Sequence, residues 1–544
     1  MKKRLLTIIG IILMAAALFT VIHFIWSDLY IAEFDTDNAE TAIWAQMTLD
    51  TGQLIDSDYF YYGMLIPVGG NLFFAPFVKA FGMGITALRV GYTVLAVLFA
   101  ALLVLALRAC LSSWDLAMIG CGLILIFTTA TERLRDIIWA HSVYYGVSAF
   151  FLLMCIGSLG LYLRGKRGLG GVLFFLSALF CSINGNAILL FTVLPLGAAI
   201  LLESMNRERS SEDFMKGPLL LICITIALGV GINKGITSGI QTPYTDGYTR
   251  ISQASEWVEH LRLLPERWFR LFFDLPEASV PVMSSVGIKL VLRLGTAIVL
   301  SVIPFFSFSM LKKNKSRLTR VFVLYHWILC AVMMFFFIFG VISGGPHRLI
   351  PLWFSCMIVD WLTMMWMVKE KGYTRIAGAV SVCAMVLFAG MTAVSVPRQP
   401  ADISIWYGVD SIYRTLQDHG LTHGYSTDFQ YGNSITVLSN GEIASRYIAL
   451  ADEGFEIPPK LTKGEWYEGA SSEERTFLIC WEQQFFENPW LADGVVEILR
   501  ATQYSPIYRS TGGYCILVYD RDVIAEKLLG IQSVDDAGTQ ASEN

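Results

Sequence analysis

Apolar runs of about 20 residues recur along this chain, and they restrict its fold more than any other feature. A helix of about 20 apolar residues is what crosses the roughly 30 Å hydrocarbon core of a bilayer. Only 16% of the residues are charged, below the roughly 25% of soluble domains, which supports a polytopic α-helical membrane protein. We predict eleven transmembrane helices, at about residues 5–26, 85–108, 116–131, 138–163, 169–183, 185–203, 217–233, 286–310, 320–342, 349–368 and 376–396. The first run is too long for a signal-peptide core, so we expect a retained anchor.

Basic residues alternate along the loops between these runs, which predicts the orientation of the chain. Every second loop is rich in Lys and Arg, as the positive-inside rule requires of cytoplasmic loops. This pattern predicts a multi-pass protein of the cell membrane with a cytoplasmic N-terminus and an extracytoplasmic C-terminal domain. The basic loops contain Lys2, Lys3 and Arg4; Arg108; Arg164, Lys166 and Arg167; Arg207, Arg209 and Lys216; Lys312, Lys313, Lys315, Arg317 and Arg320; and Lys369, Lys371 and Arg375.

The composition changes after the last apolar run. We predict a transmembrane domain over 1–396 with long outer loops at about 27–84 and 234–285, an extracytoplasmic α+β domain over 397–533, and a disordered tail over 534–544. Cys480 and Cys515 fall in two predicted strands of the α+β domain, where buried thiols are favoured over a disulfide. The domain alternates helical stretches (Ser404–Gln417, Gly432–Leu438, Leu491–Thr502) with strands (Arg446–Leu450, Arg475–Trp481, Tyr504–Arg509, Tyr514–Tyr519) and a hairpin turn at Thr511-Gly512-Gly513.

The first outer loop begins with a run of acidic residues beside the membrane. Carboxylates at the edge of a bilayer are costly unless they are paired or functional. Asp35 and Asp37 are two residues apart, so in an extended segment their side chains point to the same side. One of them can act as a general base while the other orients a hydroxyl or a cation. The structural alternative is a helix cap, because Asp37 followed by Glu40 resembles a capping box for a helix starting near Asn38.

Other polar groups gather at the predicted outer ends of the spans, whereas the span centres are nearly free of charge. A proton-coupled transporter needs ionisable groups within its helices, so this distribution favours chemistry at the membrane surface. The net charge of −5 argues against a nucleic-acid partner. The fourth outer loop contains an amphipathic stretch, Ser255–Phe273, which is expected either to lie in the interface or to pack on the bundle.

In this plan the chain resembles the GT-C membrane glycosyltransferases, in particular the protein O-mannosyltransferases and the aminoarabinose transferases. The resemblance covers the multi-span plan, the acidic segment Glu33–Glu40, the helix end His141–Tyr145 and the outward C-terminal domain. It implies an inverting enzyme that moves a hexosyl or pentosyl group from a polyprenyl-phosphate carrier to an acceptor hydroxyl on the outer face of the membrane. The chain has Phe34-Asp35-Thr36-Asp37 where O-mannosyltransferases have Asp-Glu after an aromatic residue, so two aspartates remain candidates for the base.

The resemblance also implies roles for individual residues. Asp35 is the first candidate for the general base and Asp37 the second. A divalent metal ion is not required by any motif, and if one is used, these two aspartates would be its ligands. The phosphate group would be bound by Arg348, then by Lys234, Arg250 and Arg133, and the predicted substrate-binding set is completed by His347, Glu40, His141 and Tyr62. The structural alternatives are interface snorkelling for Arg348, packing for His141 and a place in the interfacial aromatic belt for Tyr62.

The acceptor stays open between a polysaccharide, a teichoic acid, a lipid and a protein. Two other functions compete with glycosyl transfer. A transporter or flippase of lipid-linked sugars would move the carrier in vesicles without transferring sugar. A polysaccharide polymerase or ligase would require an oligosaccharide donor.

Overall fold

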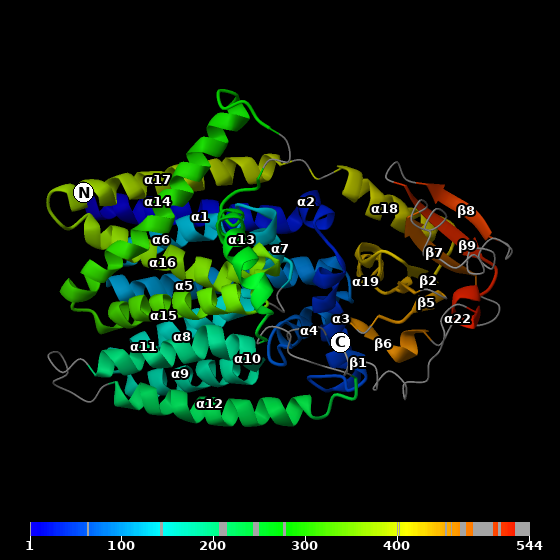
Figure 1. The fold of residues 1–544 in the computed structure, drawn as a ribbon, viewed down its shortest axis with the longest axis horizontal. Helices are drawn as coiled ribbons and strands as arrows, with labels where there is room; N and C mark the ends of the chain where they lie inside the picture. Colours follow the sequence, from blue (N-terminus) through cyan, green and yellow to red (C-terminus); the bar gives the residue numbers. More distant parts are fainter. Residues whose placement is uncertain are drawn as a thin grey trace.

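The protein is a bundle of long helices with a sheet-containing C-terminal region beyond one end, as the computed structural model in Figure 1 shows. The N-terminus lies at the opposite end of the bundle (Figure 1). The structure describes residues 2–61, 65–141, 145–205, 215–242, 250–275, 279–399, 401, 403–451, 454–458, 460–467, 475–481, 504–509 and 513–527.

Each of the eleven predicted spans contains a helix in the described residues, which confirms a multi-pass membrane protein. Within the described ranges, nine helices are long and apolar enough to cross a membrane, and a bent pair makes a tenth. The helices of the bundle are α1 (Lys2–Trp26), α5 (Ile85–Leu111), α6 (Trp114–Phe127), α8 (Tyr145–Leu163), α9 (Arg167–Ile183), α10 (Gly185–Ile188), continued by the π-helical turn η1 (Leu189–Val193) and α11 (Leu194–Ser204), α12 (Lys216–Thr237), α14 (Ser285–Lys313), α15 (Arg317–Phe339), α16 (Ile350–Met367) and α17 (Tyr373–Ser395).

The predicted boundary between the third and fourth spans is wrong. Helix α6 ends at Phe127, and a separate helix α7 (Glu132–Trp139) turns away from it by 110°. The cause is a run of threonines, because the hydroxyls of Thr128 and Thr129 bond back to carbonyls of α6 and the Thr131 hydroxyl accepts from the Leu134 N–H at 3.3 Å as the cap of α7. The fourth span therefore begins only with α8.

One span centre contains an acid, which is the main exception to the charge-poor centres expected from the sequence. Asp360 is fully buried in α16, the helix that lies deepest in the bundle. Its carboxylate oxygen Oδ2 lies 3.8 Å from the Cys356 sulfur one turn away.

Short elements cover the end of the bundle that faces the C-terminal region. The predicted first outer loop forms α2 (Asp28–Ala32), α3 (Thr36–Thr51), β1 (Tyr59–Phe60) and α4 (Gly70–Phe81). The predicted amphipathic stretch of the fourth outer loop forms a 3-10 turn η4 (Ala254–Glu256) and helix α13 (Trp257–Phe269), which packs on α15. The indole of Trp268 donates to the Ser301 hydroxyl of α14 at 2.8 Å. The face of α13 that carries Trp268 therefore packs on the bundle, which is the second of the two predicted alternatives.

The C-terminal region is built on a five-stranded mixed sheet. Its strand order is β3-β2-β7-β9-β8, with β3, β2 and β7 parallel and β9 antiparallel to both of its neighbours. The elements are α18 (Ile403–Asp418), β2 (His423–Ser426), α19 (Asn433–Leu438), β3 (Ala444–Tyr447), β4 (Ala449–Ala451), β5 (Gly454–Glu456), β6 (Thr462–Lys463), β7 (Thr476–Trp481), β8 (Tyr504–Arg509), β9 (Tyr514–Tyr519) and α22 (Val523–Lys527).

The structure agrees with most elements predicted for this region. Cys480 and Cys515 lie opposite each other on β7 and β9, buried, with their sulfurs 3.4 Å apart and no disulfide bond. The predicted strand Arg446–Leu450 is divided between β3 and β4. The predicted helix Leu491–Thr502, turn residues Thr511 and Gly512, and tail 534–544 lie outside the described residues.

A seam joins the C-terminal region to the first outer loop. Strand β6 pairs antiparallel with β1, and the Leu461 N–H donates to the Phe60 carbonyl at 2.7 Å. The Lys463 ammonium lies 3.1 Å from the Asp56 carboxylate. Helix α19 packs against α3 beside this seam. The C-terminal region is therefore fixed directly on the loop that contains the acidic run.

At the other end of the bundle, a buried ion pair gives a test of stability. Arg320 of α15 bonds to both oxygens of Glu203 of α11, and both side chains are almost fully buried. Glu203→Ala would leave the guanidinium charge buried and alone, so we expect a loss of about 3 to 5 kcal/mol in the free energy of unfolding. A Glu203→Leu/Arg320→Met double variant should recover most of this loss. Thermal unfolding in detergent measures both effects, and a single variant as stable as the wild type would contradict the assignment.

Candidate active site

The acidic run folds into the N-terminus of α3. Asp35 is the N-cap, and its carboxylate accepts a hydrogen bond from the Asn38 N–H at 3.0 Å. The Asn38 side chain accepts in return from the Asp35 N–H at 2.9 Å. This reciprocal box pairs Asp35 with Asn38, so the predicted pairing of Asp37 with Glu40 is wrong. Asp35 takes the capping position because its backbone is extended, with φ −131° and ψ −172°.

Helix α7 brings a second acid to this N-terminus. The Asn38 amide donates to the Asp136 carboxylate at 2.7 Å in a buried hydrogen bond. Arg133, one turn earlier on α7, lies 3.5 Å from the other Asp136 oxygen and is about half exposed. Sequence reasoning missed Asn38 and Asp136 as site residues, although Asp136 belongs to the conspicuous polar run between two apolar helices.

Glu33 has a structural partner. The Arg135 Nε lies 3.0 and 3.1 Å from the two Glu33 oxygens, and its terminal nitrogen NH1 donates to the Thr129 carbonyl at 3.1 Å. The Arg135 side chain is almost fully buried. This pair holds α7 against the segment between α2 and α3. Because Glu33 has this structural role, Asp35 and Asp37 are the acids of the run that are considered for chemistry.

Asp37 lies in the first turn of α3 between charges from two parts of the chain. Arg133 comes from α7, and Lys460 comes from the C-terminal region. The Lys460 ammonium lies 4.7 Å from the centre of the Phe429 ring, and the Phe429 carbonyl accepts a hydrogen bond from the Thr36 hydroxyl. The C-terminal region therefore forms one wall of the acidic site.

Both aspartates are half-buried, and this changes their acidity. Burial raises the pKa of Asp35 to about 7, and the neighbouring Asp37 charge adds to the effect. Burial also raises the pKa of Asp37 to about 6, with a further contribution from Asp136, while Lys460 and Arg133 oppose the shift. A carboxylate with a pKa near neutral pH can accept a proton under physiological conditions.

Glu40 and His141 form a buried pair behind this site. Their nearest atoms lie 4.0 Å apart, and both side chains are almost fully buried. Burial raises the pKa of the Glu40 carboxyl well above its usual range and lowers the pKa of His141 to about 3. Burial therefore disfavours the charged form of each group, so the pair fits a packed polar contact better than a charged substrate ligand.

The cations predicted to bind the phosphate lie in different parts of the structure. His347 lies within electrostatic range of His141, Arg133 and Arg348, so these groups share one side of the acidic site. The Arg348 guanidinium donates to the Val341 carbonyl. Two other predicted cations lie elsewhere, because Lys234 lines a second cavity and Arg250 is exposed beside the bridge between Ile251 and Gly340.

Tyr62 lies outside the described residues. Over the described ranges, no three or more His, Cys, Asp or Glu side chains are grouped closely enough to hold a metal ion.

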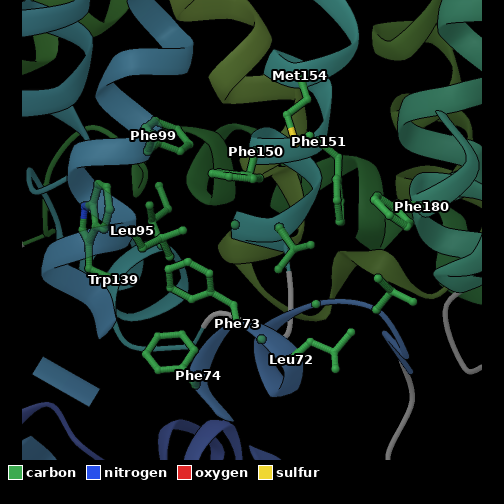
Figure 2. Close-up of a pocket in the computed structure, with 16 residues that line it drawn as sticks. Leu72, Phe73, Phe74, Leu95, Phe99, Trp139, Phe150, Phe151, Met154 and Phe180 are labelled. Carbon is green, nitrogen blue, oxygen red and sulfur yellow. The ribbon is translucent and has the colours of Figure 1, made fainter. Parts of the chain in front are cut away.

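An apolar cavity of about 350 Å³ lies next to the acidic cluster. Figure 2 shows Phe73, Phe150, Phe151 and Trp139 around it, and Phe180 at one side. Helices α4, α5, α7, α8 and α9 contribute its lining. Helix α7 also carries Asp136 and Arg133, so the apolar cavity and the acidic cluster share one short helix.

Comparisons with known proteins return structures only. A scan against known protein families finds no match, and neither does a search of curated proteins. Among solved structures, the crystal structure of ArnT from Cupriavidus metallidurans bound to undecaprenyl phosphate matches with a TM-score of 0.49 and 10% identity, over 93% of this chain and 97% of that one. The apo structure of the same ArnT matches with a TM-score of 0.48 and 11% identity, over 95% and 98%. Because these similarities are low, the function is argued from the residues of this chain.

The helix cap separates the structural role of Asp35 from that of Asp37. Asp35→Ala removes the acceptor for the Asn38 N–H, so we expect a loss of about 1 kcal/mol in the free energy of unfolding. Asp35→Ser preserves a capping oxygen and should lose much less. Asp37→Ala, in the first turn of the same helix but without the capping bond, serves as the matched control and should lose less stability than Asp35→Ala. Equal losses at both positions in thermal unfolding would show that the cap does not distinguish them.

Proposed function

We propose that this protein is an inverting membrane glycosyltransferase that moves a sugar from a polyprenyl-phosphate carrier to an acceptor hydroxyl. One observation supports it above all: two half-buried aspartates with raised pKa values lie near Arg133 of α7, and the same helix lines an apolar cavity in the membrane bundle. These features supply a base, cations for a phosphate and room for a lipid chain.

The reaction follows from these parts. The ionised aspartate takes the proton from the acceptor hydroxyl, and the oxygen attacks the anomeric carbon of the sugar. The bond between that carbon and the phosphate oxygen breaks, and the lipid phosphate leaves with the electron pair. Attack from the side opposite the phosphate inverts the anomeric carbon.

The choice between the aspartates depends on the helix cap. Asp35 is the first candidate from the sequence, but one of its oxygens already accepts the Asn38 N–H. Burial and Asp136 raise the pKa of Asp37, and the neighbouring charges of Lys460 and Arg133 oppose this rise by favouring its ionised form. We therefore assign the base to Asp37 and give Asp35 the role of holding the start of α3 and orienting the acceptor.

We assign the phosphate of the sugar donor to the side of the acidic site on which the arginines lie. Arg133 and Arg348, together with His347, are the proposed contacts of the phosphate, and the first isoprene units would occupy the apolar cavity lined by Phe150 and Phe151. No metal ion is needed for this scheme, since the arginines supply the positive charge. Undecaprenyl phosphate is a suitable first probe, because it joins a phosphate to a long apolar chain.

The orientation and the acceptor also belong to the proposal. The alternating basic loops support a cytoplasmic N-terminus, and the C-terminal region lies beyond the opposite end of the bundle (Figure 1). We assign the C-terminal region to acceptor recognition, because Lys460 and Phe429 form a wall of the acidic site. A polysaccharide, teichoic acid, lipid or protein hydroxyl can enter from that side.

Substitutions of the two aspartates test the base. Asp37→Asn should lower transfer by on the order of 10²- to 10⁴-fold, because the amide cannot take a proton. Asp35→Ser, which keeps a capping oxygen, should retain most of the activity. The measurement is transfer of radiolabelled sugar from polyprenyl-phosphate donors in proteoliposomes supplied with cell-envelope acceptors. If Asp35→Ser is inactive and Asp37→Asn active, Asp35 is the base, and if transfer survives the Asp35→Asn/Asp37→Asn double variant, the proposed enzyme function is wrong.

The pH dependence gives an independent test. A general base works only when it is ionised, so kcat/KM should fall as the pH falls below the raised pKa values of the pair. We expect the half-maximal rate between about pH 6 and 7, above the usual range of an aspartate. A profile that stays flat down to pH 4.5 would contradict the raised pKa values.

A further inference from the structure

A second cavity, of about 410 Å³, lies at the same end of the bundle as the acidic site. It is bounded by the ends of α9 and α12 and by the start of α10. Lys234 of α12 and Asn186 of α10 are exposed side chains in its lining. Unlike the first cavity, it has a lining that is about half polar.

The hydrogen bonds of the lining restrict what this second cavity can bind. The hydroxyls of Ser182, Thr237 and Thr242 already donate to backbone carbonyls, at 2.8, 2.9 and 2.7 Å. The Asn233 amide likewise donates to the Ile183 carbonyl at 2.8 Å. A hydroxyl has a single proton, so these three hydroxyls offer only oxygen lone pairs to a ligand, whereas the Asn233 amide offers its oxygen and one remaining N–H. A ligand with O–H donors of its own matches these lone pairs.

Positive charge enters the second cavity through Lys234. An ammonium has three donors and no acceptor, so it requires an anionic or oxygen-rich partner. The lining therefore favours a ligand that combines one anionic group with several hydroxyls. A phosphate ester of a polyol has this combination.

The surroundings place the second cavity at the membrane surface. Helix α12 exposes an apolar stripe of residues four apart, and the stripe ends two residues before Lys234. Acyl chains can lie along such a stripe while a headgroup reaches the cavity. The stripe consists of Leu220, Ile224, Leu228 and Ile232, exposed by 61%, 39%, 48% and 42%.

The wall between the two cavities is fixed. The Asn184 side chain accepts from the Val68 N–H at 2.9 Å and donates to the Val68 carbonyl at 2.7 Å. Val68 lines the apolar cavity, and Leu65, three residues earlier, lines the polar one. The polar cavity is therefore preformed and separate from the proposed donor site.

We propose that the second cavity binds the headgroup of a membrane phospholipid whose phosphate carries a hydroxylated substituent, as in phosphatidylglycerol. The Lys234 ammonium binds the phosphate, and the glycerol hydroxyls donate to the side-chain oxygens of Asn233 and Thr237. The acyl chains lie on the exposed stripe of α12. This site goes beyond the proposed glycosyl transfer and does not depend on it.

Native mass spectrometry of the full-length protein in detergent, titrated with phosphatidylglycerol, phosphatidylethanolamine or phosphatidic acid, tests the site. We expect a tight phosphatidylglycerol adduct that weakens at least 10-fold in Lys234→Met. Lys289→Met is the matched control, because Lys289 is also an exposed lysine near the end of a membrane helix, in the first turns of α14, but lines neither cavity. It should leave the adduct unchanged. Equal binding of phosphatidylglycerol and phosphatidylethanolamine, or equal effects of the two lysine variants, would overturn the proposal.

A second variant tests the hydroxyl recognition separately from charge. Thr237→Val removes one acceptor oxygen and keeps Lys234, so phosphatidylglycerol should lose its preference over phosphatidic acid while phosphatidic acid binds as before. An unchanged preference would overturn the role of the hydroxyls. In a third arm, soluble glycerol 3-phosphate competes with the lipid. Displacement at equal concentration would show that a free phosphate ester, and not a lipid, is the ligand.

Discussion

The hydrogen bond from Asn38 to Asp136 joins the first outer loop to the helical bundle, and the geometry of the acidic site depends on it. Asn38 is also half of the box that caps α3, so one side chain fixes the start of this helix and its distance from α7. Because the contact is buried, replacing either partner would leave an unsatisfied polar group with a cost of about 1 to 3 kcal/mol. The position of Asp37 follows from this contact, since it lies within the same turn of α3.

The sequence predicts the architecture well for a physical reason. Membrane spans need long apolar runs, and a run of that length has few alternative structures in a bilayer. Each of the eleven runs contains a helix in the described residues, and the strands Arg475–Trp481, Tyr504–Arg509 and Tyr514–Tyr519 are found within one residue of their predicted ends. The error between the third and fourth spans arises from threonines, whose hydroxyls bond to nearby carbonyls and end a helix inside an apolar sequence.

The site was harder to predict, because its members come from distant parts of the chain. Asp35 and Asp37 were found through local spacing. Asp136 and Lys460 are separated from them by about 100 and more than 400 residues, and only the fold brings their charges together. Sequence periodicity predicts helices and strands, but it does not predict contacts between residues so far apart in the chain. The same reason explains why Lys234 lies apart from the other predicted phosphate-binding cations. The position of a residue in the sequence predicts its side of the membrane but not the cavity that it lines.

Helix α7 has a consequence for the size and shape of any acceptor. Its eight residues carry Arg133 in the first turn and Asp136 in the middle, and they line the apolar cavity with Ile138 and Trp139 at the end. A helix of this length spans about 12 Å. In the proposed reaction, the sugar carbon that is attacked would therefore lie within that distance of the apolar cavity. The proposed enzyme would suit an acceptor whose hydroxyl can approach the membrane closely, such as a flexible chain, a loop or a molecule resident in the membrane.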